Sequence, residues 1–182
     1  MSDAAPTIRQ ATPADAAAWA QLRLGLWPDA DDPLEELAQS LDDDEGAVFL
    51  ACLADGEAVG FAEVRLRHDY VNGTGSSPVG FLEGWYVQPS WQGHAVGRGL
   101  LAAVQDWTRA AGRSELASDS RVEDVPAQAA PRARGFEETE RLASFLMALD
   151  SEPPRSLPLL EARHARLPFL RVLKQATMLL PH

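Results

Sequence analysis

A short glycine-containing loop is the part of the chain best suited to bind an anion. Gly93, Gly97 and Gly99 separate an apolar run, residues 79–87, from apolar residues that recur at helical spacing further along. The run predicts a buried strand and the recurrence predicts a helix. Free backbone N–H groups and the helix dipole attract negative charge at a helix start, and glycine lets the backbone approach a phosphate closely. The pattern indicates a phosphate-binding loop, although many strand–turn–helix units bind no ligand.

Two carboxylates near this loop are candidates for binding or proton transfer. Glu83 lies inside the apolar run, where a carboxylate is costly to bury without a partner. Its functional interpretation is a contact with a substrate ammonium group, and its structural alternative is an ion pair with an arginine. Asp119 follows a short predicted strand, at the carboxyl end where α/β sheets place ligands. The alternative role for Asp119 is to cap a turn or a helix.

Composition restricts the class of protein and its partners. The chain has 182 residues, 46% of them hydrophobic, which fits one soluble globular domain. A net charge of −11 argues against nucleic acid and favours a cationic partner. We expect no membrane association, because the sequence shows no long apolar run and no leader. Cys52, the only cysteine, excludes an intrachain disulfide and a multi-cysteine metal site, and it favours a cytoplasmic location.

Charge is distributed unevenly along the chain, with an acidic segment near the N-terminus and a basic segment at the C-terminus. Residues 29–45 contain nine carboxylates and no basic residue, which is typical of a solvated helix face and would also attract a polycation. Residues 151–182 are basic and apolar, with three prolines near their start. We interpret residues 1–150 as the folded domain and residues 151–182 as an added tail or loosely docked short helix. A membrane- or partner-binding element is the alternative for this tail.

The hydrophobic pattern predicts an α/β domain with the order β-α-α-β-β-β-α-β-α-β. The predicted strands are residues 7–11, 47–53, 58–66, 78–87, 114–118 and 141–149, and the predicted helices are residues 12–27, 33–41, 96–111 and 122–134. Pro126 and Pro131 weaken the last helix. Apolar residues alternate with Glu63, Arg65 and Arg67, so one face of that strand is expected to be solvated. The strand with Glu83 is expected to be buried on both faces.

The glycine loop resembles the pyrophosphate loop of the GCN5-related N-acetyltransferase (GNAT) superfamily. Gln92-x-x-Ala95-x-Gly97 is similar to the pattern Arg/Gln-x-x-Gly-x-Gly/Ala with which these enzymes hold acetyl-coenzyme A. Ala95 stands where the first glycine is usual, so either its methyl group crowds the pyrophosphate or the backbone there needs no positive φ. The resemblance implies a GNAT fold, with a mixed, mostly antiparallel central sheet flanked by helices, and acetyl-CoA as co-substrate with no metal. It implies cofactor contacts from Trp85, Tyr86, Val87, Gln92, Gly93, His94, Ala95, Val96, Gly97, Arg98 and Asp124.

Five local strings together resemble the aminoglycoside 6′-N-acetyltransferases over residues 7–150. The strings are Leu22-x-x-x-Leu26-Trp27-Pro28, His68-Asp69-Tyr70-Val71-Asn72-Gly73, residues 77–84 (SPVGFLEG), Ala117-Ser118-Asp119 and residues 135–140 (GFEETE). In that family the positions of Trp27, Tyr70, Glu83, Asp119 and Glu140 line the aminoglycoside pocket. The resemblance assigns catalysis to Glu83 and Asp119.

The resemblance implies acetylation of the 6′-amino group of aminoglycosides by direct attack in a ternary complex, which confers resistance. Backbone N–H groups around residues 85–87 would bind the acetyl carbonyl, and Glu83 would bind the 6′-ammonium. Two alternatives remain open: an acetyltransferase for another polyamine or a protein N-terminus, and a degenerate acetyl-CoA-binding protein without turnover. Members of this family often form dimers, so a homodimer is expected.

The chain departs from the family pattern at three further positions. Pro131 replaces a Tyr or His near the leaving thiol, Asp124 replaces an Asn that faces the cofactor, and Ser144 replaces an aromatic residue. Proline cannot donate a proton, so a general acid from that helix is in doubt. These changes and Ala95 favour the non-catalytic alternative, whereas Glu83 and Asp119 argue against it.

Overall fold

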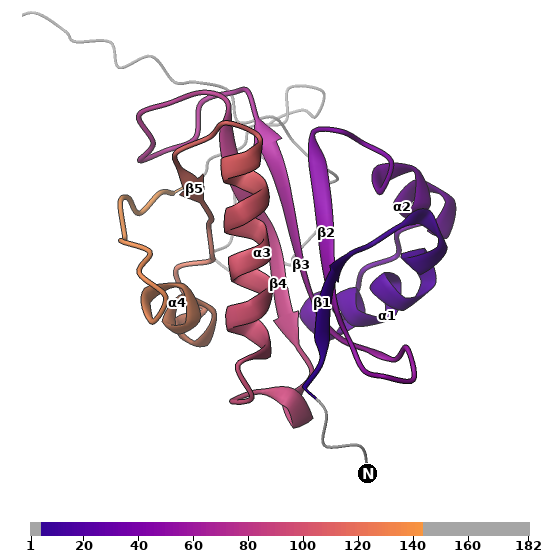
Figure 1. The fold of residues 1–182 in the computed structure, drawn as a ribbon. Coiled ribbons are helices and arrows are strands. Elements are labelled where there is room, and N and C mark those ends of the chain that lie inside the picture. The colour runs from indigo at the N-terminus through magenta and orange to yellow at the C-terminus, as the bar shows by residue number, and fades with distance from the viewer. Residues whose placement is uncertain (1–4, 144–182) are drawn as a thin grey trace, which may run out of the picture. The chain divides into compact units, whose positions relative to one another are not determined.

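The computed structural model describes residues 5–143 (Figure 1). The chain divides into two units, Met1–Glu140 and Arg141–His182, and the first contains every element discussed below. Residues 141–143, where the sequence predicts the start of a last strand, are not in a strand. The rest of that strand, Ser144 and the tail 151–182 lie outside the described residues.

The first unit is built on a five-stranded sheet with the strand order β1-β2-β3-β4-β5. Its strands are β1 (Thr7–Gln10), β2 (Gly46–Cys52), β3 (Ala58–Arg67), β4 (Val79–Val87) and β5 (Leu116–Ala117). The first four pair antiparallel in succession, and β5 pairs parallel to β4. The mixed, mostly antiparallel sheet predicted from the sequence is therefore confirmed.

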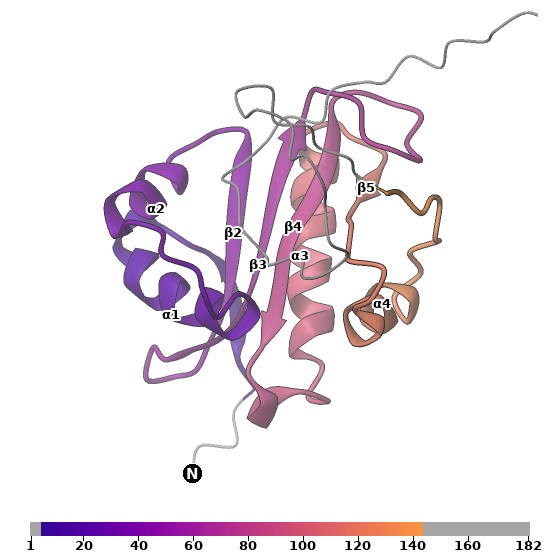
Figure 2. The same ribbon diagram turned by 180° about the vertical axis from the view of Figure 1, so that it is seen from behind.

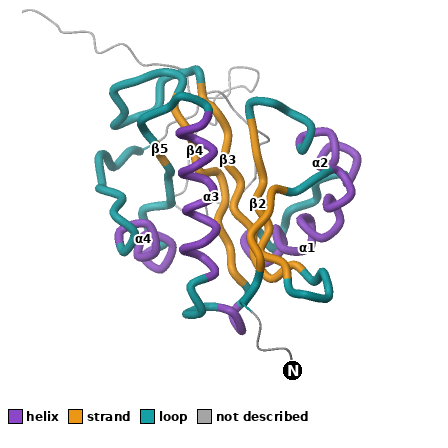
Figure 3. Tube along the Cα trace, viewed as in Figure 1, coloured by secondary structure: helices purple, strands orange, loops and turns teal. Residues whose placement is uncertain are grey.

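Helices cover both faces of this sheet (Figures 1 and 2). One face carries α3 (Val96–Ala110), and the other carries α1 (Ala16–Leu26) and α2 (Leu34–Ser40), while α4 (Val125–Arg132) follows β5. Figure 3 shows the long α3 lying along β3 and β4. Alternate residues of β2 serve the two faces, because Phe49 packs in the core under α3 and Leu50 packs in the core under α1. We call these the α3 face and the α1 face.

Local chemistry explains where two of these elements begin. Pro13–Asp15 forms a short 3-10 turn, η1, before α1, and the Asp15 carboxylate accepts hydrogen bonds from the N–H and the hydroxyl of Thr12 at 2.8 and 2.9 Å. In the hairpin between β2 and β3, Gly56 has φ 93° and Asp55 accepts a hydrogen bond from the N–H of Glu57 at 3.0 Å. The helix predicted at residues 12–27 and the strands predicted at residues 47–53 and 58–66 are present, with their ends shifted by a few residues.

The prediction that the face of β3 with Glu63, Arg65 and Arg67 is solvated is wrong. Glu63 is 9% exposed, and Arg65 and Arg67 are half-buried. The alternation is real, but α1 and the chain around it cover the face that the charged residues occupy. The prediction for β4 is correct for residues 79–82, whereas Glu83 and residues 85–87 are half-buried. Within residues 5–143, no helix is long and apolar enough to cross a membrane.

Candidate active site

A β-bulge sets the direction of Glu83. Glu63 pairs with Gly84 and Val64 pairs with Leu82, so Glu83 is the extra residue in β4. Such a bulge re-aims side chains and twists the strand. Leu82 packs in the core under α3, whereas a Cβ on Gly84 would meet Glu63 on the α1 face. The bulge thus lets β4 change its side-chain alternation at the position of the predicted catalytic carboxylate.

Glu83 forms a two-pronged ion pair with Arg67. Nη2 of Arg67 lies 2.9 Å from each Glu83 carboxylate oxygen, and Nε lies 3.1 Å from Oε1. The guanidinium also stacks over Phe81, with its Cζ 3.5 Å from the ring centroid. This is the ion pair that the structural interpretation predicts, so the pair itself does not separate that interpretation from substrate binding. The Glu83 side chain keeps 15% exposure.

Asp119 acts on Glu83 electrostatically. Burial raises the pKa of Glu83, the ion pair with Arg67 opposes this rise, and the negative charge of Asp119 adds to it. Asp119 itself is exposed, two residues after the end of β5. The structure therefore brings the two predicted catalytic carboxylates near each other, although they are far apart in the sequence.

A second buried ion pair, which the sequence analysis missed, lies beside this site. Nη1 of Arg23 is 2.6 Å from Oε2 of Glu63, and its Nη2 is 3.1 Å from Asp32. The guanidinium lies near two indole rings, with its Cζ 5.1 Å from the centroid of Trp19 and 4.6 Å from that of Trp27. Burial raises the pKa of Glu63, Arg23 opposes this, and Glu83 raises it further. The available sequence signal was the i, i+4 spacing of residues 19, 23 and 27 on one helix face.

Trp27 begins a row of aromatic rings on the α1 face. Its ring centroid is 6.3 Å from that of Phe61, which is 6.4 Å from that of Tyr86. A Cβ on Gly84 would lie 2.7 Å from Cη2 of Trp27, so the ring sits against the residue next to Glu83. Gly25 leaves room for the ring of Tyr86 against α1. The structure thus places Trp27 against Gly84, the residue after Glu83, and packs the Tyr86 side chain against the α1-face core.

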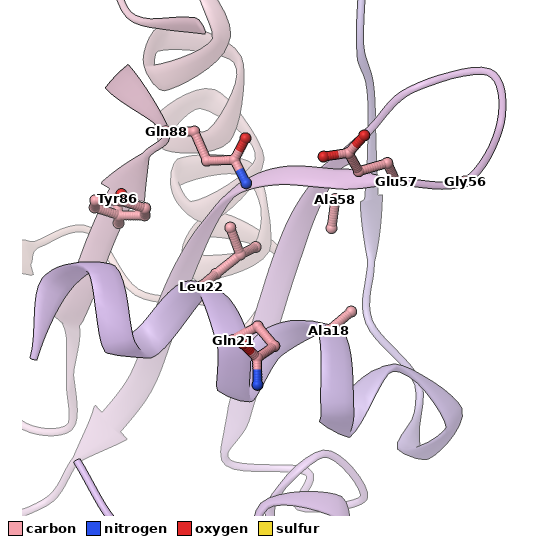
Figure 4. A pocket seen from close by; sticks show the side chains of 8 residues that line it. All are labelled: Ala18, Gln21, Leu22, Gly56, Glu57, Ala58, Tyr86 and Gln88. Carbon is pink, nitrogen blue, oxygen red and sulfur yellow. The ribbon is translucent and has the colours of Figure 1, made fainter. Parts of the chain in front are cut away.

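A pocket on the α1 face lies at the end of β4. It is lined by Ala18, Gln21, Leu22, Gly56, Glu57, Ala58, Tyr86 and Gln88 (Figure 4). Figure 4 shows Leu22 and Gln21 on α1 and Glu57 at the β2–β3 hairpin. Neither Glu83 nor Asp119 lines this pocket, so it adjoins the candidate site without containing its carboxylates.

The glycine loop leads from β4 into α3. Its first part is a 3-10 turn, η2 (Pro89–Trp91), and Nε2 of Gln92 donates a hydrogen bond to the carbonyl of Val87 at 3.1 Å. Ala95 has φ 63°, so the backbone at this position adopts the left-handed conformation that glycine usually provides there. The N–H groups of the first turn of α3 have no partner within the helix, as at any helix start. The N–H groups of residues 96–98 thus have no acceptor within α3, at the position where the sequence predicts an anion site.

The edge of β4 beyond Leu82 is open in the described part of the chain. Pairing between β4 and β5 covers only Gly80–Leu116 and Phe81–Ala117, and the hydroxyl of Ser118 donates to the carbonyl of Leu82 at 3.0 Å. After this point β5 has ended and no other described strand takes its place. An unpaired strand edge can bind an extended chain by backbone hydrogen bonds. This edge, residues 83–87, runs from Glu83 directly to the glycine loop.

Three of the predicted site residues, Tyr70, Asp124 and Glu140, lie in exposed segments around the sheet. Tyr70 is 55% exposed, in the loop between β3 and β4. Glu140 is exposed and follows Thr139, whose side chain contacts Gly73 of the same loop. Asp124 caps α4, because its carboxylate accepts from the N–H of Ala127 at 3.0 Å. This helix role competes with the predicted cofactor contact of Asp124.

Two further loop residues and one helix residue make local contacts. Nδ1 of His94 lies 3.0 Å from the carbonyl of Gln92, and its ring contacts Trp91 edge-on at 5.7 Å. Pro131 lies inside α4 without ending it at that residue. Within the described ranges, no group of three or more His, Cys, Asp or Glu residues is placed to hold a metal ion.

The acidic stretch is not only a solvated face. Asp43 pairs with Arg65, Glu45 lies 2.6 Å from Nε2 of His68, and Asp32 pairs with Arg23. These contacts tie residues 29–45 to α1, to β3 and to the loop that carries Tyr70.

The comparisons with known proteins identify the class of this fold and site. Residues 14–136 match the acetyltransferase (GNAT) family, and the chain belongs to this family. It is 82% identical over 150 residues to an aminoglycoside N(6′)-acetyltransferase type 1 from Stenotrophomonas maltophilia, a match that covers 82% of this chain and 98% of that protein. It is 46% identical over 140 residues to a protein of the same name from Salmonella enteritidis, with 76% of this chain and 96% of that protein covered.

Solved structures give the same result. AAC(6′)-Iy in complex with the bisubstrate analogue CoA-S-monomethyl-acetylneamine has a TM-score of 0.73 and 44% identity, covering 78% of this chain and 97% of that chain. AAC(6′)-Ih from Acinetobacter baumannii has a TM-score of 0.74 and 33% identity, covering 79% and 98%. The sequence resemblance and the predicted GNAT fold are thus confirmed.

Proposed function

We propose that this chain transfers the acetyl group of acetyl-CoA to the 6′-amino group of aminoglycosides and so confers resistance. The observation that carries the proposal is the position of Glu83. It lies on a bulge where the pairing of β4 with β5 ends within the described residues, near Asp119 and at the opposite end of that stretch of β4 from the glycine loop. The names of the relatives from Stenotrophomonas maltophilia and Salmonella enteritidis support the same activity.

The two reactants have separate places. The pyrophosphate of acetyl-CoA would bind the free N–H groups of residues 96–98, and its extended arm would follow the backbone edge of residues 85–87. The cationic amino sugar would bind on the α1 face, with Trp27, Tyr70 and Glu140 around the ring and Glu83 and Asp119 at the amine. A negative net charge of −11 favours the approach of such a polycation.

The reaction needs positioning more than covalent help. A neutral amine nitrogen attacks the thioester carbonyl, the new N–C bond forms and the C–S bond breaks, and the proton on that nitrogen passes through water to the solvent. Backbone N–H groups of residues 85–87 would stabilise the oxyanion. Glu83 already forms an ion pair with Arg67, so the substrate ammonium would be its second cationic partner. Asp119 would also face the positive charge of this ammonium. With Pro131 in α4, the coenzyme A sulfur leaves as a thiolate without a proton from that position.

Several broader features remain part of the proposal. We place the enzyme in the cytoplasm as a homodimer, without nucleic acid or membrane partners. The single cysteine and the acidic charge support this setting. The catalytic domain would span residues 1–150, with residues 151–182 as an added tail.

Release of coenzyme A in the presence of different acceptors tests the activity. We expect turnover with kanamycin and tobramycin. An aminoglycoside that carries a 6′-hydroxyl in place of the 6′-amine should give no N-acetylated product at the 6′ position. Mass spectrometry and NMR of the product would locate the acetyl group. Equal turnover of spermidine and tobramycin would replace the antibiotic assignment by a general polyamine acetyltransferase. Acetyl-CoA binding in calorimetry without turnover of any acceptor would favour the non-catalytic alternative.

A further inference from the structure

The buried pair of Arg23 and Glu63 has no role in the mechanism above. Glu63 is 9% exposed, and the Arg23 side chain is 16% exposed. Replacing a buried ion pair by apolar side chains of similar volume is often neutral or stabilising, because both charges lose their hydration on folding. Stability alone therefore gives a weak reason for charged residues at these two positions.

The location of the pair connects it with the candidate site. Glu63 is the cross-strand neighbour of Gly84, directly next to the bulge residue Glu83. A Cβ on Gly84 would lie 3.2 Å from Cγ and Cδ of Glu63, so the glycine allows this carboxylate side chain to pack against β4. Glu63 is also near enough to Glu83 for their charges to interact.

Arg23 links this carboxylate to Trp27. Its Cζ lies 4.6 Å from the Trp27 ring centroid and 5.1 Å from that of Trp19. Through Asp32 it also holds the connection between α1 and α2, which begins at Trp27. One side of the Trp27 ring thus faces a cation that Glu63 fixes, and its edge rests against Gly84.

We propose that Arg23 and Glu63 are positioning residues that hold Trp27 beside Glu83 and thereby determine affinity for the acceptor amino sugar. This inference rests on the proposed function, in which Trp27 packs against the acceptor. The pair carries no net charge, so Glu83 and Asp119 remain the negative groups that face the amine. Binding of acetyl-CoA, which uses the far end of β4 and the start of α3, does not depend on the pair.

A charge-balanced double variant tests the inference. Arg23→Met/Glu63→Met removes the pair without changing net charge, and Glu63→Gln serves as the test if the double variant does not fold. We expect the Kd and KM for tobramycin to rise about tenfold, while the Kd for acetyl-CoA stays within twofold. The control, Asp106→Met/Arg109→Met, removes an exposed pair near the far end of α3 and should leave both constants within twofold. Unchanged tobramycin binding in a folded variant, or an equal loss for acetyl-CoA, would overturn the inference.

A second comparison separates positioning from a general structural role. In a Trp27→Phe background, removal of the Arg23–Glu63 pair should add less than twofold to the tobramycin Kd, because residues that act through one another give non-additive effects. Fully additive losses would show that the pair does not act through Trp27. Calorimetric binding of tobramycin also keeps the two proposals apart. Binding without acetylation by the wild type would contradict the proposed function alone, whereas no binding by the wild type would contradict both.

Discussion

Arg67 holds both carboxylate oxygens of Glu83 through one nitrogen, Nη2, at 2.9 Å each. The ion pair is half-buried, and the guanidinium is fixed from the other side by Phe81. Glu83 is therefore already oriented before any ligand arrives. A substrate ammonium that binds Glu83 joins a charge-assisted contact whose geometry is set by β3 and by the bulge in β4.

Glu83→Gln should lower kcat/KM for tobramycin. The change keeps the shape of the side chain and removes the charge that we expect to bind the amine. Loss of one charge-assisted contact costs about 1.5–3 kcal/mol, or roughly one to two orders of magnitude in kcat/KM. The Kd for acetyl-CoA should hardly change. Tobramycin kinetics within twofold of the wild type would make Glu83 a structural residue, and a collapse of acetyl-CoA binding would show that it supports the strand.

The pH profile should report the ionisation of Glu83. Its pKa is raised by burial, so the active carboxylate form is lost as the pH falls through this raised value, and kcat/KM for tobramycin should fall with it. Arg67→Met removes the group that opposes the rise, which moves the acidic limb to higher pH. Arg109→Met, an exposed site on α3, is the control and should leave the limb in place. Superimposable limbs in wild type and Arg67→Met would contradict this assignment.

The fold and the glycine loop could be predicted because their signals are local. The period of apolar residues in α3 fixes the face that Leu100 and Val104 bury, and Pro89 with Gly93 marks the turn before it. Glu83 was predicted as a candidate because a charge inside an apolar run needs a partner. The sequence does not say which partner, since Arg67 comes from the neighbouring strand.

The missed features depend on tertiary packing. The alternation of β3 is correct, but the burial of Glu63 follows from α1 covering that face, with Arg23 supplied from forty residues earlier. The bulge at Glu83 is a matter of register between two strands, which side-chain alternation does not reveal. Asp124 caps α4, a role that the local sequence favours, whereas the family resemblance assigned it to the cofactor.

Ala95→Gly should stabilise the fold. Ala95 has φ 63°, a conformation that costs an L-residue roughly 1–2 kcal/mol. Glycine avoids this cost but loses about 0.5–1 kcal/mol, because its chain is more flexible in the unfolded state. We expect the free energy of unfolding in urea to rise by about 0.5–1 kcal/mol, with acetyl-CoA binding unchanged or tighter. Ala102→Gly, at an exposed position inside α3, should instead lose about 1 kcal/mol. A large loss of cofactor affinity in Ala95→Gly would show that the loop is arranged differently.

Asp15→Ala should destabilise the start of α1 in a pH-dependent way. Hydrogen bonds from Arg9 and Thr12 lower the pKa of Asp15 below its usual value. The contribution of this carboxylate is therefore complete above about pH 4, its unfolded pKa, and is lost as the pH falls toward the lowered folded pKa. We expect a loss of about 1 kcal/mol at pH 7, which shrinks below pH 4. A difference between wild type and variant that stays constant down to pH 3 would rule out this ionic contribution.

Gly84→Ala should disturb the acceptor side of the site. The added Cβ would lie 2.7 Å from Cη2 of Trp27 and 3.2 Å from the side chain of Glu63. Contacts below 3.0 Å force a neighbour to move, and overpacking of this kind costs about 1–3 kcal/mol. We expect a lower free energy of unfolding and a raised Kd for tobramycin, with the Kd for acetyl-CoA within twofold.

Gly46→Ala is the matched control for this change. Gly46 lies in β2 of the same sheet, and its added Cβ would meet its nearest atoms, on Arg65 and Val64, at an ordinary 3.5 Å. Because alanine loses less backbone freedom on folding than glycine, this variant should be as stable as the wild type or more stable. It should also bind tobramycin normally. If Gly84→Ala matched Gly46→Ala in both stability and tobramycin binding, the Trp27 ring would be free to move aside, and its fixed position against β4 could not set acceptor affinity.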